Sequence, residues 1–305
     1  MKEIIYIERE CPVCGSNEIF SLLAGQNIDI SKINALSFAS RKLPELMHHR
    51  MVVCANCDLA YANPVPNNEW LKEEYVYADF DSMAEGIYAA KSYVKLLSGI
   101  ENKLLPKSGI LDIGTGDGAF LNELSKHGYN QFIGVEPSRA PVRQASDKIQ
   151  PYIKESFFDS EDFTPRCFNY VTCFQTLEHV TEPLSLCLGA YKLLKPGGAF
   201  LCVVHNYRSF SARLMGAKSP IFDIEHLQLF SPQSIKSMLE RTGFIDINIR
   251  SFVNSYPISY WLKLIYLPHR IKRITEALLS TFKLTKFVMP LRAGNLAAVG
   301  FRPSE

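Results

Sequence analysis

The sequence predicts an α/β protein with a mostly parallel, seven-stranded sheet and a small N-terminal zinc-binding domain. From Gly109 onward, apolar segments of strand length alternate with amphipathic helical segments, which is the pattern of βαβ units. Ahead of this region stand two Cys-x-x-Cys pairs, a spacing typical of metal-binding turns. These two observations decide the predicted architecture.

The individual elements follow from apolar spacing and from helix-terminating residues. Ser138 and Ser231-Pro232 are expected to begin helices, and Gly128 and Gly243 to end them. The expected strands are 109–114, 131–136, 151–156, 169–175, 198–205, 244–252 and 295–301. The expected helices of this region are 119–128, 138–148, 182–194 and 231–243.

Three parts of the chain are expected. Residues 1–66 form the zinc-binding domain and end in the turn-prone Asn63-Pro64-Val65-Pro66. Residues 67–105 have helical apolar spacing and form a helical linker or lid. Residues 106–305 form the main domain, interrupted by an insertion at 253–292.

Composition excludes several classes of protein. The 305 residues are 47% hydrophobic and 21% charged, with a net charge of +2, so no overall basic field predicts a nucleic-acid partner. No secretory signal and no apolar run of membrane-spanning length is present. We therefore expect a soluble, cytoplasmic protein whose paired cysteines bind metal rather than form disulfides.

A glycine-rich turn after the first strand is the sharpest motif. Residues 110–118 read ILDIGTGDG, and Glu136 ends the next strand 22 positions after Gly114. Such a turn lets the backbone approach a ligand, and the acidic residue is placed to accept hydrogen bonds from ribose hydroxyls. The carboxylates of Asp112 and Asp117 would repel a pyrophosphate but attract a sulfonium and an ammonium. The turn therefore favours S-adenosylmethionine over a nicotinamide dinucleotide.

Four motifs together resemble the class I S-adenosylmethionine-dependent methyltransferases, which have a Rossmann-like fold. They are LDIGTGDG, GVEP, FNYVTCFQTLEHV and LLKPGG. The third is usually written with an aspartate where this chain has Asn169. The resemblance implies that Asp112, Gly114 and Gly116 surround the methionine moiety and that Glu136 binds the ribose. Thr115, Pro137 and Gln175 are expected to border the cofactor with them.

A narrower resemblance concerns the substrate. The Cys-x-x-Cys-Gly start, the second pair followed by Asn-Pro-x-Pro, the Leu-Glu-His-Val segment and Glu225-His226-Leu227 are similar to bacterial methyltransferases of sugar and surface-polysaccharide pathways. This resemblance implies O-methylation of a sugar or glycan precursor. Sugar C-methylation on a nucleotide-linked deoxysugar is the alternative, although those enzymes have a further C-terminal domain.

The paired cysteines predict a structural zinc site. Cys11 and Cys14 form one pair, and Cys54 and Cys57 form the other, with 39 residues between them. Two such turns converge into a closed tetrahedral Cys₄ site, which leaves no position for catalysis. Two unrelated pairs, or one redox-active pair, are the alternatives. The neighbouring His48 and His49 are expected to be exposed loop residues.

Candidate catalytic groups lie after the fourth and fifth strands. Transfer to a hydroxyl requires alignment and removal of a proton, for which histidine is suited. His179 follows the fourth strand at the edge of the sheet where ligands bind; a capping or packing role is the alternative. By resemblance to sugar methyltransferases, His226 is the expected general base and Glu225 its partner, unless the pair only anchors its loop. Tyr75 and Tyr77 are candidates for a lid, or ordinary packing residues.

The insertion is apolar and basic. Six Lys or Arg and one Glu fall between Ile258 and Met289. This composition is compatible with a helix on an anionic membrane surface, or with a cap over the substrate pocket or a dimer contact.

Two further functions are compatible with parts of the sequence. An RNA methyltransferase with a zinc reader module would require a basic N-terminal region with stacking aromatic residues, which residues 1–65 do not clearly show. A non-enzymatic zinc-dependent interaction protein would not need the glycine turn and Glu136. We therefore expect a small-molecule or glycan substrate and no nucleic acid.

Overall fold

The computed structural model describes residues 4–39, 45–80, 83–100, 106–264 and 269–304. Its main sheet has seven strands in the order β12-β13-β10-β9-β6-β7-β8. Only β13 runs against its neighbours, which confirms the predicted mostly parallel Rossmann-like sheet. The strands are β6 (Ser108–Ile113), β7 (Asn130–Glu136), β8 (Ile153–Glu155), β9 (Phe168–Phe174), β10 (Leu194–His205), β12 (Ile245–Pro257) and β13 (Val288–Phe301).

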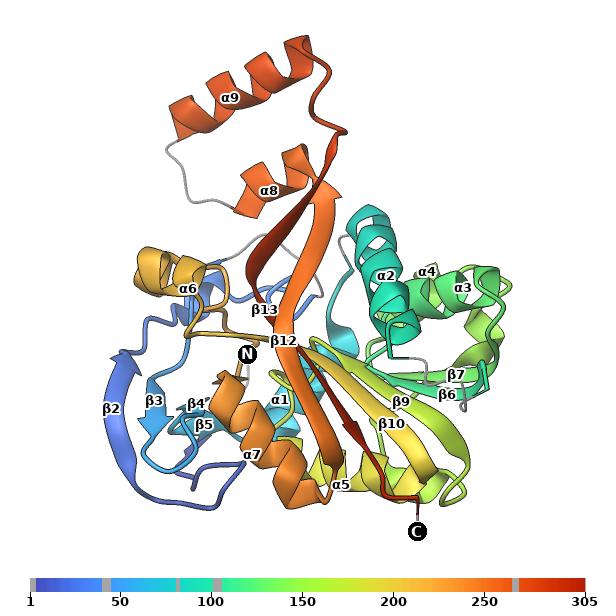
Figure 1. Cartoon of the computed structure of the whole chain (residues 1–305). Coiled ribbons are helices and arrows are strands. Elements are labelled where there is room, and N and C mark those ends of the chain that lie inside the picture. The colour runs from blue at the N-terminus through green and yellow to red at the C-terminus, as the bar shows by residue number, and fades with distance from the viewer. Residues whose placement is uncertain (1–3, 40–44, 81–82, 101–105, 265–268, 305) are drawn as a thin grey trace.

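The central strands are apolar throughout because helices cover both faces of the sheet. Ile110 and Tyr170 pack on one face with α2 (Met83–Ser98) and α3 (Ala119–Lys126). Their strand neighbours Leu111 and Val171 pack on the other face with α5 (Pro183–Leu193) and α7 (Pro232–Thr242). The alternation of side chains along each strand therefore builds two separate core layers. Figure 1 shows α2 and α3 on one side of the sheet and α5 and α7 on the other.

Residues of the N-terminal region form two further sheets. The smaller one pairs β1 (Tyr6–Ile7) with β5 (Val65–Pro66). The larger one has the order β11-β4-β3-β2 and contains β2 (Ile19–Ala24), β3 (Met51–Cys54), β4 (Ala60–Ala62) and β11 (Gln228–Leu229). Because β11 comes from the main domain, this sheet contains strands from both sides of the expected boundary at residue 66. The expected division into three folding units stays a prediction.

Some element bounds differ from the expected ones. The helical segment ahead of the sheet is divided into α1 (Asn68–Tyr77) and α2. The helix expected to reach residue 148 ends sooner, as α4 (Arg139–Gln144), and Ser138 makes no side-chain cap. The chain turns there because Ile149 packs inward against Gly118. The remaining short elements are α6 (Phe210–Met215) and the 3-10 helices Ile30–Lys32, Gln150–Tyr152, Ser160–Asp162 and Gly216–Lys218.

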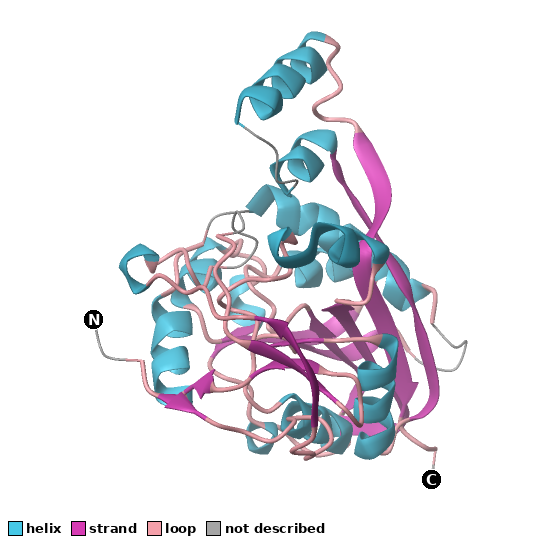
Figure 2. Cartoon of the chain, turned by 90° about the vertical axis from the view of Figure 1, so that its left-hand side faces the viewer, coloured by secondary structure: helices cyan, strands magenta, loops and turns pink. Residues whose placement is uncertain are grey.

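Strands β12 and β13 extend beyond the sheet as a long hairpin. Their pairing continues to Pro257 and Val288, and the hairpin carries α8 (Ile258–Leu264) and α9 (His269–Thr281). Figures 1 and 2 both show the hairpin extending to one end of the molecule, and in Figure 1 α9 is the outermost element, with α8 between it and the rest. None of the described helices has the length and apolarity needed to cross a membrane.

Candidate functional site

A cavity of about 830 Å³ lies at the carboxyl ends of β6, β7, β9 and β10. This is the edge at which open α/β sheets bind ligands, because the loops after neighbouring strands diverge there. One half of the cavity is bordered by the glycine turn after β6 and by the end of β7. The other half is bordered by α1, α8 and the segment between β10 and β11.

The glycine turn needs its glycines for two different reasons. Gly114 has φ +77°, and a Cβ there would lie 2.2 Å from Oγ1 of Thr176, so a side chain would collide with the loop after β9. Gly116 has φ +60°, and a Cβ there would meet no atom within 4 Å. Since Gly116 borders the cavity, its bare backbone forms part of the wall. The turn therefore admits close approach of a ligand to the main chain.

Glu136 is held rigidly at the end of β7. Its Oε2 accepts a hydrogen bond from the Gly116 N–H and its Oε1 accepts one from the Ser138 N–H, both at 2.9 Å. The residue is 7% exposed and borders the cavity. Each carboxylate oxygen keeps a second lone pair, so the group fits the two adjacent hydroxyls of a ribose.

The other expected cofactor residues occupy different positions. Thr115 and Pro137 border the cavity, and the Thr115 side chain packs over Gly134 of β7. Asp112 lies behind the turn, outside the cavity wall, where it accepts a hydrogen bond of 2.6 Å from Thr172 Oγ1. Its carboxylate therefore ties β6 to β9 beneath the turn.

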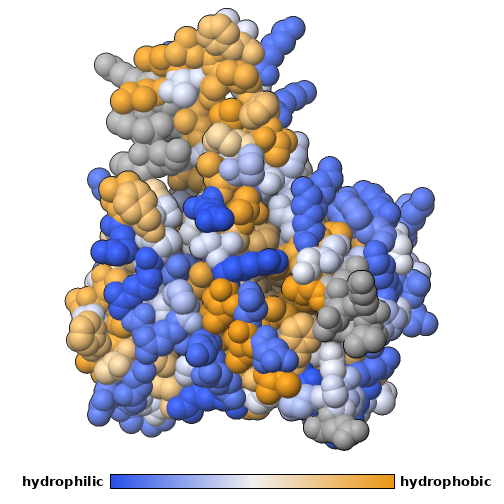
Figure 3. Space-filling model, in the orientation of Figure 1, coloured by the Kyte–Doolittle hydropathy of each residue, from blue (hydrophilic) through white to orange (hydrophobic). Residues whose placement is uncertain are grey.

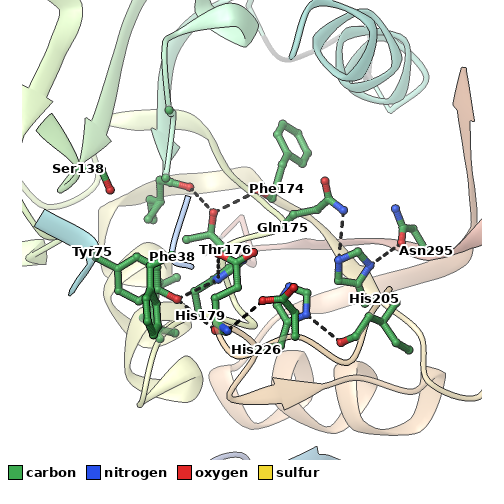
Figure 4. A pocket seen from close by; sticks show the side chains of 18 of the residues that line it. Phe38, Tyr75, Ser138, Phe174, Gln175, Thr176, His179, His205, His226 and Asn295 are labelled. Carbon is green, nitrogen blue, oxygen red and sulfur yellow. Dashed lines mark hydrogen bonds and ion pairs between the residues drawn. The ribbon is translucent and has the colours of Figure 1, made fainter. Parts of the chain in front are cut away.

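Three histidines line the second half of the cavity. The ring of His226 lies between those of His179 and His205, with centroid separations of 5.0 and 4.9 Å. Figure 4 shows the three rings in a row, with Tyr75 at one end and Asn295 at the other. His179 Nδ1 lies 3.5 Å from Glu225 Oε2. The expected catalytic residues His179, Glu225 and His226 are thus brought together.

The tautomer of His226 follows from its backbone contact. Nδ1 lies 2.8 Å from the carbonyl oxygen of Ile221. A carbonyl oxygen only accepts, so Nδ1 carries the proton, and in the neutral ring the lone pair is on Nε2. The residue is 6% exposed and borders the cavity. This arrangement suits Nε2 to accept a proton from a ligand hydroxyl.

Gln175 links the cofactor half to the histidine row. Its Oε1 accepts a hydrogen bond of 3.0 Å from the Tyr93 hydroxyl, and its Nε2 lies 3.5 Å from His205 Nε2. Its φ of +51° is in the left-handed region, which is uncommon and costly for a residue with a side chain. Gln175 therefore borders both halves, as expected of a cofactor-side residue.

A domain-wide comparison identifies the family. The model described as "Methyltransferase domain" matches residues 84–248. The match covers more than half of the chain and includes the glycine turn, Glu136 and the histidine row. The chain belongs to this methyltransferase family. Together with the expected cofactor turn, this makes it an S-adenosylmethionine-dependent methyltransferase.

Curated relatives of the methyltransferase share about half of its length. A ubiquinone biosynthesis O-methyltransferase of Aliivibrio fischeri is 25% identical over 179 residues, which is 52% of this chain and 76% of the relative. The enzyme of the same name from Vibrio cholerae is 25% identical over 178 residues, 52% of this chain and 72% of the relative.

Two solved structures are similar to part of the chain. A SAM-dependent methyltransferase from Archaeoglobus fulgidus has a TM-score of 0.49 and 16% identity, covering 77% of this chain and all of that one. A SAM-dependent methyltransferase from Thermotoga maritima, described as a possible histamine N-methyltransferase, has a TM-score of 0.47 and 19% identity, with 72% and 91% covered.

The methyltransferase also brings its four N-terminal cysteines together. The Sγ atoms of Cys11 and Cys57 are 3.5 Å apart, those of Cys14 and Cys54 are 3.4 Å apart, and all four lie within 4.8 Å of one another. A disulfide has sulfur atoms about 2.05 Å apart, whereas four sulfurs bound tetrahedrally at about 2.3 Å are about 3.8 Å apart. The cluster therefore has the dimensions of a Cys₄ zinc site.

The expectation that His48 and His49 are exposed was wrong. His48 is 3% exposed and His49 is fully buried. His48 Nδ1 lies 2.9 Å from the His49 carbonyl oxygen, and His49 Nε2 lies 2.9 Å from that of Ile224. Both histidines are therefore held by backbone carbonyls, in the contact between the N-terminal region and the main domain.

Of the two lid candidates, only Tyr75 lies in the cavity wall. The Tyr75 hydroxyl lies 3.0 Å from His179 Nδ1 and donates a hydrogen bond of 3.1 Å to the Glu225 carbonyl oxygen. Tyr77 is 68% exposed, does not border the cavity, and has Arg139 over its ring. The two tyrosines differ because only Tyr75 lies on the inward face of α1.

Several wall residues were not predicted from the sequence. His205 ends β10, and its Nδ1 lies 2.8 Å from Asn295 Oδ1 on β13. Tyr256, Tyr260 and Trp261 also border the cavity, from β12 and α8; they belong to the insertion, for which a cap over the substrate pocket was one expectation but no single wall residue was named. The only sequence signal for His205 is its place at the end of the expected fifth strand, the position that identified His179 after the fourth.

Proposed function

We propose that the methyltransferase transfers a methyl group to a hydroxyl of a sugar or glycan precursor, with His226 as the general base. The observation that carries the proposal is the Nδ1 contact of His226 with the Ile221 carbonyl oxygen, which leaves Nε2 as the proton acceptor of the neutral ring. The cavity that this ring borders is continuous with the glycine turn. The expected cofactor turn and the proposed base therefore border the same cavity.

The polar wall supports a hydroxylated acceptor. The acceptor half of the cavity is lined by serines, acidic residues, histidines and an amide: Ser209, Ser211, Asp223, Glu225, His226, His179, His205 and Asn295. Tyr256, Tyr260 and Trp261 add apolar ring surfaces. A wall with many donors and acceptors beside aromatic rings is suited to a sugar, which has polar edges and apolar C–H faces.

The protein's part in the reaction is to hold the acceptor and remove its proton. S-adenosylmethionine, when bound, supplies an electrophilic methyl group on a sulfonium. Gly114, Gly116 and Glu136 would hold its methionine and ribose parts. His226 Nε2 would take the hydroxyl proton as the acceptor oxygen bonds to the methyl carbon, while the methyl–sulfur bond breaks with its electron pair going to sulfur and S-adenosylhomocysteine leaves. Glu225 and Tyr75 position His179 beside His226.

A second candidate function is O-methylation of a phenol. The relatives named above are ubiquinone biosynthesis O-methyltransferases, and the aromatic side of the wall suits a planar ring. Sugar C-methylation is a third outcome, for which His226 would take a proton from carbon instead of oxygen.

We also propose that Cys11, Cys14, Cys54 and Cys57 bind one structural zinc ion. Zinc would hold two turns that are separated by 39 residues of sequence and that pack directly into the core beneath α7. The four thiolates would saturate the metal, so its role would be in folding.

Transfer of labelled methyl from S-adenosylmethionine tests the proposal. Nucleotide sugars, lipid-linked glycans, prenylated phenols and RNA from the native host are offered separately to the purified enzyme. Label in either sugar fraction, retained as an O-methyl ether after hydrolysis, supports the proposal. Label only in phenols supports the second candidate, and label only in RNA overturns both.

A further inference from the structure

We propose that the arm between β12 and β13 binds the surface of an anionic membrane. The arm consists of α8, α9 and the segment from α9 to Val288, of which residues 258–264 and 269–288 are described. This binding goes beyond the proposed reaction, because it concerns a surface and not the cavity chemistry.

The outer helix of the arm has an unpartnered apolar face. Ile271, Ile274 and Leu278 are 50%, 62% and 55% exposed. Their spacing of three and four residues places them on one side of α9. None of them belongs to the core clusters of the described residues. The apolar face of α9 is therefore turned to solvent.

The segment after α9 continues this exposed surface. Phe282 and Phe287 are 69% and 60% exposed, and Leu284 is 41% exposed. Lys283 and Lys286 alternate with them and are also exposed. Figure 3 shows hydrophobic residues gathered over this end of the molecule, with hydrophilic side chains extending from its edge. Apolar and basic residues together are the composition of helices that lie in the membrane interface.

The base of the arm is fixed to the protein. Trp261 and Leu262 of α8 are both 7% exposed, and Trp261 Nε1 donates a hydrogen bond of 2.9 Å to the Met289 carbonyl oxygen. The Ile258 N–H donates one to the Phe287 carbonyl oxygen. Because α8 is anchored inward, the exposed face of α9 and the phenylalanines after it remain available for an external partner.

The charge of the arm favours an anionic membrane over a second copy of the chain as its binding partner. Six Lys or Arg and one Glu lie between Ile258 and Met289, so two arms packed together would repel each other. Anionic lipid head groups attract the same charges. No described helix is able to span a bilayer, so the contact would be interfacial. Tyr260 and Trp261 of the same arm border the cavity, which would bring its mouth close to the lipid surface.

Co-sedimentation with vesicles tests this proposal without measuring methyl transfer. The full chain is mixed at low salt with vesicles of phosphatidylcholine containing phosphatidylglycerol, and with pure phosphatidylcholine vesicles. We expect binding to the anionic vesicles only, with loss at high salt. The double variant Ile274→Asp/Leu278→Asp should abolish binding. The double variant Lys283→Gln/Lys286→Gln should weaken it about fivefold for each charge removed.

The matched control is Phe20→Asp on β2. Phe20 is 74% exposed and lies in the N-terminal sheet, so its replacement removes exposed apolar surface and adds a negative charge outside the arm. This variant should bind the vesicles like the unaltered chain. Failure of the unaltered chain to bind at low salt, or binding that survives in Ile274→Asp/Leu278→Asp, overturns the proposal. An arm-dependent dimer in light scattering without vesicle binding would overturn it in favour of a second copy.

Discussion

The hydroxyl of Tyr75 lies 3.0 Å from Nδ1 of His179, although the two residues are 104 positions apart in the sequence. The same hydroxyl donates a hydrogen bond to the Glu225 carbonyl oxygen, so it accepts the one from His179. Burial raises the pKa of Tyr75 well above its ordinary value, and the charge of Glu225 adds to the shift. The neutral phenol therefore joins α1, the loop after β9 and the segment before β11.

Replacement Tyr75→Phe tests this link. It removes both hydrogen bonds and leaves the Glu225 carbonyl oxygen without this donor, which should cost about 1–3 kcal/mol of stability. Because His179 loses its orientation, kcat should fall about tenfold with a smaller change in the cofactor dissociation constant. Tyr77→Phe is the matched control. Equal effects of the two substitutions on kcat would contradict the assigned role of Tyr75.

His226→Ala should lower kcat by about 10²–10⁴-fold, the range of general-base catalysis. The glycine turn and Glu136 are unaffected, so S-adenosylmethionine should bind as before in isothermal titration calorimetry. His127→Ala serves as control, since His127 is an exposed histidine at the end of α3. A kcat close to that of the unaltered enzyme would rule out His226 as the base.

Glu136→Gln tests the ribose assignment. The amide has the same size as the carboxylate but only one oxygen that accepts hydrogen bonds. Two backbone N–H groups, of Gly116 and Ser138, donate to the two carboxylate oxygens, so one of them would lose its acceptor. Hydrogen bonds to a charged group contribute about 1.5–3 kcal/mol, so the dissociation constant of S-adenosylmethionine should rise about 10- to 150-fold. Glu155→Gln at the end of β8, which is partly exposed beside Arg139, should leave it unchanged. Unaltered affinity in Glu136→Gln would place the ribose elsewhere.

Glu178 predicts a pH dependence of stability. Burial raises the pKa of this carboxyl to about 8, whereas its ordinary value is 4.5. The folded state therefore keeps a proton that the unfolded state releases, and stability should fall as pH rises from about 4.5 to about 8, by on the order of 5 kcal/mol. Glu178→Gln keeps an acceptor for the His205 N–H and should remove this slope. Denaturant unfolding across this pH range measures the free energy of unfolding, and Glu240→Gln, at an exposed position, is the control. An unchanged pH slope in Glu178→Gln would show that another group causes the pH dependence.

The cysteine cluster predicts one equivalent of zinc by elemental analysis. Cys54→Ser should abolish retention of the metal and lower the thermal midpoint, because without this ligand the metal no longer joins the two turns. Cys167→Ser, at a partly buried cysteine outside the cluster, should retain the metal. A metal-free native protein whose thermal midpoint is insensitive to chelators would show that the four thiols only pack.

The sheet and the cofactor turn were predictable because their signals are local. Apolar runs, helix caps and the alternate glycines lie within a few neighbouring residues, and each of the seven expected strands corresponds to a strand of the structure. The N-terminal sheet was not predicted. Its fourth strand, β11, is contributed by Gln228–Leu229, and pairing over that separation leaves no periodic pattern in either segment.

The sheet, the glycine turn with Glu136 and the two cysteine pairs can be predicted from the sequence, since each depends on spacing along one short segment. Which side chains share the acceptor half of the cavity depends on how distant segments pack. His205 meets Asn295 because β10 and β13 lie antiparallel with those two residues in register, and Tyr75 meets His179 because α1 folds over the sheet edge. Burial of apolar surface drives these distant segments to pack together. The polar residues that become neighbours as a result have no signal of their own in the sequence.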